Sequence, residues 1–182
     1  TDVIIAGMGA ETISSIIEAA QWLQNGINLI LQPMTKTPFL RRWLYENGYE
    51  IVREEAVTDG EYIYTVINAV FSGYRIKIND TFADLGMFDF SDENSVKYAE
   101  RQYSRLKRIS DGMKKAGKYN ETAQLDSECR VISDIAEGKR NITVGMIYDE
   151  INRVAPFSSQ DSWDNSGLLV GDRENEVTGI LT

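Results

Sequence analysis

Histidine is absent from this 182-residue sequence, and cysteine occurs once, at Cys129. Without histidine, the chain excludes Ser-His-Asp and Cys-His catalysis, histidine-ligated zinc and imidazole acid-base chemistry. A single cysteine forms no internal disulfide and no thiolate metal site. Apolar runs all fall well short of the roughly 18 residues that a membrane span needs. Together these absences predict a cytoplasmic protein with no metal centre and no membrane partner.

The distribution of charge is uneven. With 28 acidic and 19 basic residues, the net charge is -9, which for the whole chain argues against a generic nucleic-acid binder. Residues 97–118, however, carry +6, which leaves -15 on the remainder. This polarity is typical of a surface that binds a phosphate backbone, although a solvated helix face explains it equally well. The candidate RNA-binding residues are Lys97, Arg101, Arg105, Lys107, Arg108, Lys114, Lys115 and Lys118.

Strand and helix patterns alternate over residues 2–72. Thr37 and Pro38 look like the N-cap and first residue of a helix, and Asn47-Gly48 like its end. Strands separated by helices predict an α/β fold with a parallel sheet, and the last two strands predict an antiparallel hairpin at its edge. The expected strands are 3–6, 28–33, 49–57 and 61–71, and the expected helices are 11–24 and 37–48.

The pattern of apolar and charged residues changes twice further along the chain. Residues 73–90 read as irregular, and residues 92–137 read as two charged helices joined by the loop "KKAGKYNET", a helical hairpin. From residue 142 a short amphipathic helix and a turn-rich stretch follow. The expected division is therefore a sheet domain at 1–72, a linker and hairpin at 73–140, and the start of a second domain at 141–182.

The segment Gly7-Met8-Gly9 follows the first expected strand directly. It is not a dinucleotide fingerprint, because Thr12 stands where the third glycine should be, and it lacks the Gly-Lys-Ser/Thr of a P-loop. The two glycines allow a ligand to approach the backbone at the carboxyl end of a parallel strand, and a simple packing turn is the alternative. Trp22 and Trp43 have apolar neighbours on helix faces, which predicts core packing.

Three strings carry a family resemblance: "DVIIAGMGAETISSIIEAA", "LILQPMTKTPFLRRWLYENGYEIVREE" and "YIYTVINA". They resemble the carboxyl-terminal half of the bacterial tRNA (adenine-22-N1)-methyltransferase family, whose signature reads "IAGMGG" and later "LQPM...LR.WL..NGY". The hairpin, to about residue 139, is similar to that family's coiled-coil appendage. The resemblance implies the carboxyl-terminal half of a class I, Rossmann-like methyltransferase sheet, with S-adenosylmethionine as cofactor and tRNA as partner.

By the same resemblance, the Gly7–Gly9 loop lies beside the methyl donor and the target base. The resemblance implies that Gly7 and Gly9 contact the cofactor. Candidate contributors to catalysis are the backbone of Gly7 and Gly9, Met8 as an apolar wall, and Gln32 with Pro33 at the end of the next strand, where an amide meets a base edge. Met8 as a core residue and Gln32 as a strand-end cap are equally compatible with the sequence. Ala10 replaces the family's usual second glycine.

The strands that grip the cofactor in that family would precede Thr1. We therefore expect this chain to be inactive by itself and to self-associate through an exposed sheet edge.

A second resemblance begins at residue 143. The string "TVGMIYDEINRVAPFSSQDSWDNSGLLVGD" is similar to the amino terminus of the GTP cyclohydrolase I type 2 homologue family, hexamers with a dinuclear metal centre. That family's histidine ligands are not in this sequence, so no metal residue is assigned. The two resemblances together suggest a fusion with its junction near residues 139–142. An extended member of the second family and a non-catalytic RNA-binding module remain as alternatives to a methyltransferase.

Overall fold

The computed structural model describes residues 1–138 and residue 172. Contacts divide the chain into two units, Thr1–Glu137 and Gly138–Thr182, and the first unit contains both the sheet and the hairpin. The expected second domain at 141–182 lies, apart from Asp172, outside the described residues. The division of residues 1–140 into two domains stays a prediction.

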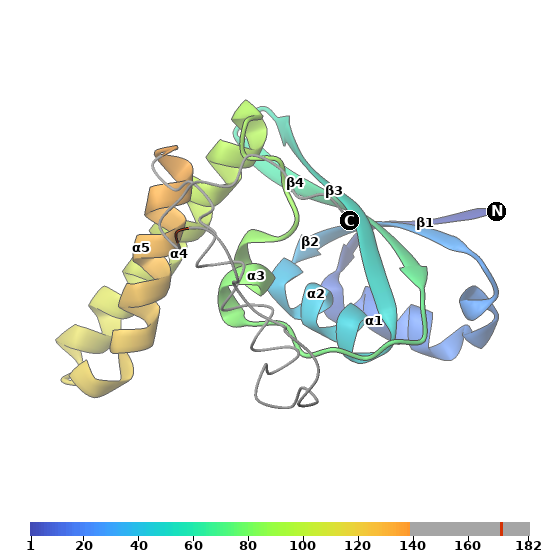
Figure 1. Cartoon of the computed structure of the whole chain (residues 1–182), viewed down its shortest axis with the longest axis horizontal. Helices are drawn as coiled ribbons and strands as arrows, with labels where there is room; N and C mark the ends of the chain where they lie inside the picture. The colour runs from blue at the N-terminus through green and yellow to red at the C-terminus, as the bar shows by residue number, and fades with distance from the viewer. Residues whose placement is uncertain (139–171, 173–182) are drawn as a thin grey trace. The chain divides into compact units, whose positions relative to one another are not determined.

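A mixed sheet of four strands forms the centre of the first unit (Figure 1). Its strands are β1 (Asp2–Gly9), β2 (Asn28–Thr35), β3 (Tyr49–Asp59) and β4 (Tyr62–Phe71), in the order β1-β2-β4-β3. β1 and β2 are parallel, and β4 runs antiparallel to both of its neighbours. The α/β class and the antiparallel hairpin at the edge of the sheet are thus confirmed.

Two helices cover one face of this sheet. α1 (Ala10–Ala19) and α2 (Thr37–Glu46) place Ile13, Ile17, Leu40 and Leu44 in one core cluster with the inward side chains of the strands. In Figure 1 both helices lie on the same side of the sheet. Each fully buried Leu or Ile in such a core contributes roughly 1.5–3 kcal/mol relative to an exposed one.

The first helix is shorter than the sequence indicated. α1 ends at Ala19, because the backbone of Ala20 (φ -108°, ψ 67°) leaves the helical region and a 3-10 turn, η1 (Gln21–Gln24), follows. This turn buries Leu23 and leaves Trp22 58% exposed, so the core position predicted for Trp22 is wrong. Trp43 does pack against the core, where its ring stacks on Tyr49 with centroids 6.1 Å apart.

The start of α2 also differs from the prediction. Lys36, not Thr37, is the N-cap residue, and it adopts a left-handed conformation with φ 57°. Thr37 is therefore the first helical residue and Pro38 the second, a position where the missing N–H of proline is still harmless. The predicted end of the helix is confirmed, with Asn47 as C-cap.

A β-bulge divides β3 into two halves. The register with β4 shifts between Ile51 and Arg53, so that Val52 is the extra residue. Before the bulge, Tyr49 and Ile51 point into the core, whereas after it Glu54 and Ala56 do so. The bulge therefore turns a glutamate toward the covered face of the sheet.

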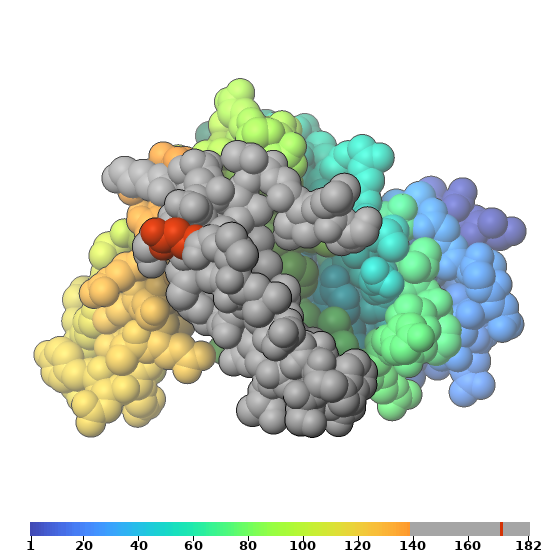
Figure 2. All heavy atoms as spheres, viewed as in Figure 1, coloured from blue at the N-terminus to red at the C-terminus, as the bar shows by residue number. Residues whose placement is uncertain are grey.

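A long helical hairpin follows the sheet. Its helices are α4 (Glu93–Lys115) and α5 (Ala123–Ala136), joined through the 3-10 turn η2 (Tyr119–Glu121). Leu106, Cys129 and Ile132 are buried along the seam between the helices, which confirms the predicted hairpin. Its tip, yellow in Figures 1 and 2, lies far from β1.

A short helix that the sequence reading missed, α3 (Asp80–Leu85), lies between the sheet and the hairpin and contacts both α2 and α5. Asn79 is its N-cap residue, and the Asn79 side chain accepts a hydrogen bond from the Phe82 N–H at 2.7 Å. None of the helices within residues 1–138 is long and apolar enough to cross a membrane.

Candidate functional site

The Gly7–Gly9 segment lies at the carboxyl end of β1, where the register with β2 becomes irregular. Gly7 has φ +75°, a conformation that L side chains rarely adopt, and a Cβ there would meet open space. At Gly9 a Cβ would lie 3.2 Å from Thr35 Oγ1, so this glycine permits the close approach of β2. Ala10 is completely buried at the start of α1. Its methyl group therefore leaves the exposed surface of the loop unchanged.

Gln32 ties the ends of β1 and β2 together. The Gly7 N–H donates a hydrogen bond to Gln32 Oε1 at 2.8 Å, while Gln32 Nε2 makes only long contacts, to the Pro33 carbonyl at 3.4 Å and Met34 Sδ at 3.5 Å. The amide thus fixes the loop through its oxygen and retains donor capacity on its nitrogen. Met8 is 41% exposed, so it is a surface residue of this edge and not a core residue.

A groove adjoins this edge of the sheet. Beyond the pair Leu31–Ile67, β2 and β4 are no longer paired, and the space between them has a volume of about 720 Å³. One wall is the connection from β2 to α2, a second is the beginning of β4, and α4 supplies the third. The lining residues are 33–38 and 62–65, together with Tyr98, Arg101, Gln102 and Arg105.

The eight predicted RNA-binding cations fall into two groups. Four of them make ion pairs: Lys97 with Glu93, Arg105 with Asp84, Lys114 with Asp126, and Lys118 with Glu121. Bonding to Asp126 raises the pKa of Lys114, and the bond from Lys114 lowers the pKa of Asp126. The other four are exposed and make no ion pair among the described residues; they are Arg101, Lys107, Arg108 and Lys115.

Three of the unpaired cations share one side of α4. Arg101, Arg108 and Lys115 follow each other at seven-residue spacing, which keeps them on one helical face, whereas Lys107 lies on a different side. We call these three residues the basic stripe. The stripe begins beside the groove, because Arg101 is part of the groove's wall, and it continues along the hairpin.

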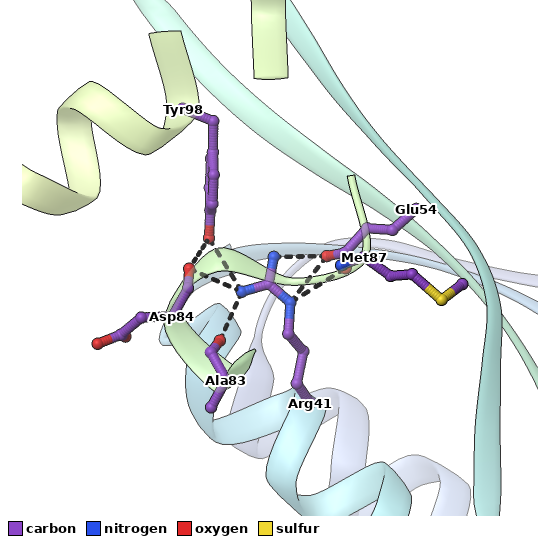
Figure 3. A network of polar contacts seen from close by, with 6 residues as sticks. All are labelled: Arg41, Glu54, Ala83, Asp84, Met87 and Tyr98. Carbon is purple, nitrogen blue, oxygen red and sulfur yellow. Dashed lines mark hydrogen bonds and ion pairs between the residues drawn. The ribbon is translucent and has the colours of Figure 1, made fainter. Parts of the chain in front are cut away.

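A buried polar network connects the hairpin to the sheet (Figure 3). The guanidinium of Arg41, on α2, donates to Glu54 of β3 through Nη2 at 2.6 Å and Nε at 2.9 Å. Its Nη1 donates to the Ala83 carbonyl at 2.6 Å and to the Asp84 carbonyl and Tyr98 hydroxyl at 3.1 Å. Both charged side chains are completely buried. One arginine thereby joins elements α2, β3, α3 and α4.

The surroundings of this network reinforce it. Burial, the largest single effect, lowers the pKa of Arg41, but the charges of Glu54 and Tyr98 and the hydrogen bonds to both together outweigh it, and the pKa is raised. Desolvation likewise raises the pKa of Tyr98, which keeps its hydroxyl neutral and able to donate to the Asp84 carbonyl at 3.1 Å. The Arg41 guanidinium also lies 5.5 Å and 5.4 Å from the ring centroids of Phe88 and Tyr98.

The sequence reading missed this network, although one signal was present. Arg41 occupies the same helical stripe as Leu40, Leu44 and Tyr45, all of which are buried. An arginine at an apolar position of an amphipathic helix indicates a buried charge with a partner. The sequence does not identify Glu54 as the partner, because Glu54 faces inward only as a result of the bulge in β3.

A second polar cluster lies where α3, α4 and α5 meet. Glu128 and Asp84 are both buried, and Arg105 pairs with Asp84 at 2.6 Å. Glu128 Oε1 has no hydrogen-bond partner among the described residues. Desolvation, followed by the charge of Asp84, raises the pKa of Glu128 from its ordinary 4.5 to about 7.

Comparison with known proteins identifies relatives of both parts of the chain. Residues 1–67 match the Methyltransferase domain family. Residues 142–182 match the Duf34/NIF3 (NGG1p interacting factor 3) family. Both expected resemblances are confirmed, in the expected order along the chain.

The methyltransferase-like part is similar to several solved structures. A protein of the NADB-Rossmann superfamily from Streptococcus agalactiae has a TM-score of 0.59 at 24% identity, covering 74% of this chain and 59% of that one. A putative tRNA (m1A22) methyltransferase of Streptococcus pneumoniae, in complex with S-adenosyl-L-methionine, gives 0.58 at 23%, with coverage of 74% and 59%. The M1A22 tRNA methyltransferase TrmK of B. subtilis gives 0.53 at 22%, with coverage of 76% and 62%. These likenesses show a Rossmann-like methyltransferase fold, of which the chain spans about three fifths.

The second part has curated relatives over a short stretch. GTP cyclohydrolase 1 type 2 homologues are 47% identical over 34 residues in Campylobacter jejuni and 67% identical over 27 residues in Staphylococcus aureus strain COL. These stretches cover 19% and 15% of this chain, and 14% and 7% of the relatives. The chain thus spans a small part of these relatives.

Proposed function

We propose that the protein is part of an S-adenosylmethionine-dependent tRNA methyltransferase that methylates N1 of an adenine. The observation that carries this proposal is the exposed Gly7–Gly9 segment at the carboxyl edge of a parallel strand pair, beside a groove that α4 closes with Arg101. The match of residues 1–67 to a methyltransferase domain supports the reaction class. The likeness to structures described as tRNA (m1A22) methyltransferases supports the choice of substrate.

The proposed reaction suits a chain without histidine. Adenine N1 carries an in-plane lone pair and needs no base before it attacks a methyl group, so the protein's task is positioning and a suitable polar environment. When bound, S-adenosylmethionine supplies an electrophilic methyl group. Met8 then forms an apolar wall, and Gln32 Nε2 donates a hydrogen bond to the base edge while its oxygen holds Gly7. Pro33 is buried, so it supports this strand end from within and does not contact the base.

The described residues fit one wall of the cofactor site. The open backbone at Gly7 allows the cofactor to approach closely. The chain spans about three fifths of the solved structures that it resembles, and the remaining walls of the site would come from the part of those structures that it does not cover. We therefore expect the 182-residue chain by itself to give no measurable methylation of tRNA, and to associate with itself through the edge of β1.

The proposed role of the hairpin is to hold tRNA. A cation that is already paired within the protein must give up that pair before it neutralises a phosphate, whereas the basic stripe has no such competitor among residues 1–138. Arg101, Arg108 and Lys115 are therefore the main phosphate contacts, and Arg105, Lys114 and Lys118 contribute less.

The test is binding of fluorescein-labelled tRNA to the whole chain, measured by anisotropy over a range of salt concentrations. Substitution of Arg101→Glu together with Arg108→Glu should weaken binding at least tenfold and flatten the salt dependence by between one and two counterions. The matched control is Arg75→Glu with Lys77→Glu, two exposed cations outside the hairpin that change the net charge equally. The control should bind within about twofold of the wild type.

The outcomes separate the candidate functions. An equal loss in both double variants would mean that tRNA responds only to net charge, and the proposal would fail. In a second assay, the part of a related methyltransferase domain that this chain does not cover is added in trans. Full tRNA binding without cofactor, together with no methylation in this second assay, would favour a non-catalytic RNA-binding module. Methylation under that complementation would establish the enzyme.

A further inference from the structure

The outer edge of β3 borders another groove, which we call the edge groove. β3 is the last strand of the sheet, so alternate residues of β3 direct their backbone N–H and C=O groups away from β4. Among residues 1–138, the backbone of residues 52–58 makes no backbone hydrogen bond to any element other than β4. A cavity of about 660 Å³ lies along this edge. It is lined by residues 52–57 on one side and by Met87, Asp89, Asp92, Asn94 and Ser95 on the other.

The wall opposite β3, residues 87–95, lies on the covered side of the sheet. Phe88 of this wall belongs to one buried cluster with Ala56, which faces the core. At one end of the groove, the Thr58 hydroxyl donates a hydrogen bond to Asn94 Oδ1 at 3.1 Å and joins the two sides. The wall and the bulge in β3 together restrict the free edge. The edge groove therefore has room for a single short strand, whereas the broad edge of another sheet would be kept away.

The covered side of the edge groove is acidic. Asp89 and Asp92 make no ion pair within residues 1–138. Each carboxylate accepts a hydrogen bond from a backbone N–H, Asp89 from Ser91 at 2.9 Å and Asp92 from Ser95 at 3.0 Å. These bonds leave both negative charges without a counterion. Met87 lies beside them and is 41% exposed, so this side suits Lys or Arg, whose apolar stems and charged ends would contact Met87 and the carboxylates.

The opposite face of the same strand edge is apolar. Val52 and Val57 point away from the core there, and their side chains are 46% and 42% exposed. Arg53 and Glu55, which lie between them on this face, form an ion pair with each other and leave no net charge. This face therefore suits apolar side chains from a neighbouring strand, which would remove both valines from water.

Successive side chains of a β-strand point to opposite faces, so an added strand would present every second side chain to the acidic side and the others to the apolar face. We propose that the edge groove binds an extended segment of a partner protein, in which basic and apolar residues alternate, by strand addition to β3. Its backbone pairs with the free groups of residues 52–57, its basic side chains meet Asp89 and Asp92, and its apolar side chains cover Val52 and Val57. The two carboxylates would repel the phosphates of a nucleic acid strand. This inference goes beyond the proposed function and does not depend on tRNA binding.

The test measures binding of the whole chain to the fluorescein-labelled peptide Lys-Val-Lys-Val-Lys-Val by fluorescence anisotropy. Asp89→Asn together with Asp92→Asn removes both charges, while the asparagines still accept the two backbone hydrogen bonds. This variant should bind the peptide roughly threefold to tenfold more weakly. The matched control is Glu18→Gln with Glu46→Gln, two exposed acids of α1 and α2 that change the net charge equally. The control should bind within about twofold of the wild type.

Two N-methylated forms of the peptide test the pairing of the backbones. In an added strand, the N–H groups of alternate residues face the same side, so either those of the valines or those of the lysines bond to β3. Methylation of the bonded set should weaken binding at least roughly tenfold, and methylation of the other set should leave it nearly unchanged. NMR signals of the backbone amides of residues 53–58 should shift on titration with the unmodified peptide.

Each contrary result overturns the proposal in a recognisable way. Equal affinities for the two N-methylated peptides, with no shift of the amides of residues 53–58, would exclude strand addition. Equal binding of a Glu-Val-Glu-Val-Glu-Val peptide would show that the acidic side does not select a basic partner. If no peptide binds and the chain forms dimers in which the amides of residues 53–58 are protected from hydrogen exchange, the edge groove is an interface between copies. None of these results affects the tRNA-binding test, so the proposed function stands or fails separately.

Discussion

Two buried polar clusters adjoin α3, and their buried charges are compensated in different ways. Around Arg41, all three guanidinium nitrogens donate hydrogen bonds, and Glu54 also accepts one from the Met87 N–H at 3.0 Å. Around Glu128, two buried carboxylates share one arginine, and Oε1 has no partner among the described residues. The first cluster is fully paired and fixes the hairpin to the sheet. In the second, burial and the charge of Asp84 raise the pKa of Glu128 to about 7, which favours its protonated form at low pH.

The largest effect is expected where the paired cluster is broken. Arg41→Met leaves Glu54 buried without its cation, and the free energy of unfolding should fall by roughly 3–5 kcal/mol. Urea unfolding followed by far-UV circular dichroism measures this loss. The double variant Arg41→Met with Glu54→Gln removes the stranded charge and should recover part of the stability. A single variant within about 1 kcal/mol of the wild type would show that the pair is dispensable.

A smaller loss of unfolding free energy is expected from substitution of Gly86, which lies against the Arg41–Glu54 pair. Gly86 has φ +78°, and an added Cβ would lie 2.4 Å from Glu54 Oε2 and 2.5 Å from Arg41 Nη2. Gly86→Ala should therefore cost about 2–4 kcal/mol, from backbone strain and displacement of the ion pair together. Gly117 also has φ +78° but nothing within 4 Å of its added Cβ, so Gly117→Ala measures the cost of a positive φ without a clash, about 1–2 kcal/mol. The strain at Gly86 is larger, because its ψ of -165° lies in a region that essentially only glycine adopts. Equal losses at the two sites would contradict the role of the cluster.

The smallest effect on stability is expected from substitution of Glu128 in the second cluster, and it is a gain, not a loss. Because the pKa of Glu128 rises from 4.5 to about 7 on folding, the folded state binds more protons than the unfolded state within that window. Stability contributed by this site is therefore present at low pH and is lost as the pH rises from about 4.5 to about 7.

Glu128→Gln should remove this pH dependence and stabilise the protein by about 1–2 kcal/mol above pH 8, after allowance for solvent screening. Thermal unfolding at a series of pH values gives the comparison. The exposed Glu18 provides the control, because Glu18→Gln should leave the pH profile unchanged. A profile for Glu128→Gln that follows the wild type would refute the buried, protonated carboxyl.

Periodic elements could be predicted from the sequence, and local irregularities could not. The alternation of strands and helices over residues 2–72, and the hairpin after residue 92, follow from regular apolar spacing, which single residues hardly disturb. Trp22 was placed wrongly because a change of backbone direction at Ala20 leaves no periodic signal. Short α3 was missed because six residues hold too few turns to show a period, although Asn79 provided a capping signal.

In the candidate site, too, some features could be predicted from the sequence and others could not. Gly7 and Gln32 were singled out from their places at strand ends, and the structure joins them directly by a hydrogen bond. The division of the α4 cations into paired and unpaired groups depends on acids from other elements, such as Asp84 and Asp126. No spacing within α4 reports those partners. The groove is likewise invisible in the sequence, because it exists only where β2 and β4 stop pairing.

The bulge at Val52 shifts the alternation of inward and outward side chains along β3 by one residue. Odd-numbered residues face the core before it, and even-numbered residues face the core after it. If β3 kept Val52 but paired with β4 without the bulge, Arg53 would take the position that Glu54 occupies, opposite Arg41, and two cations would meet in a dry interior. The hairpin, more than forty residues further along the chain, is thus anchored by a single surplus residue at the edge of the sheet.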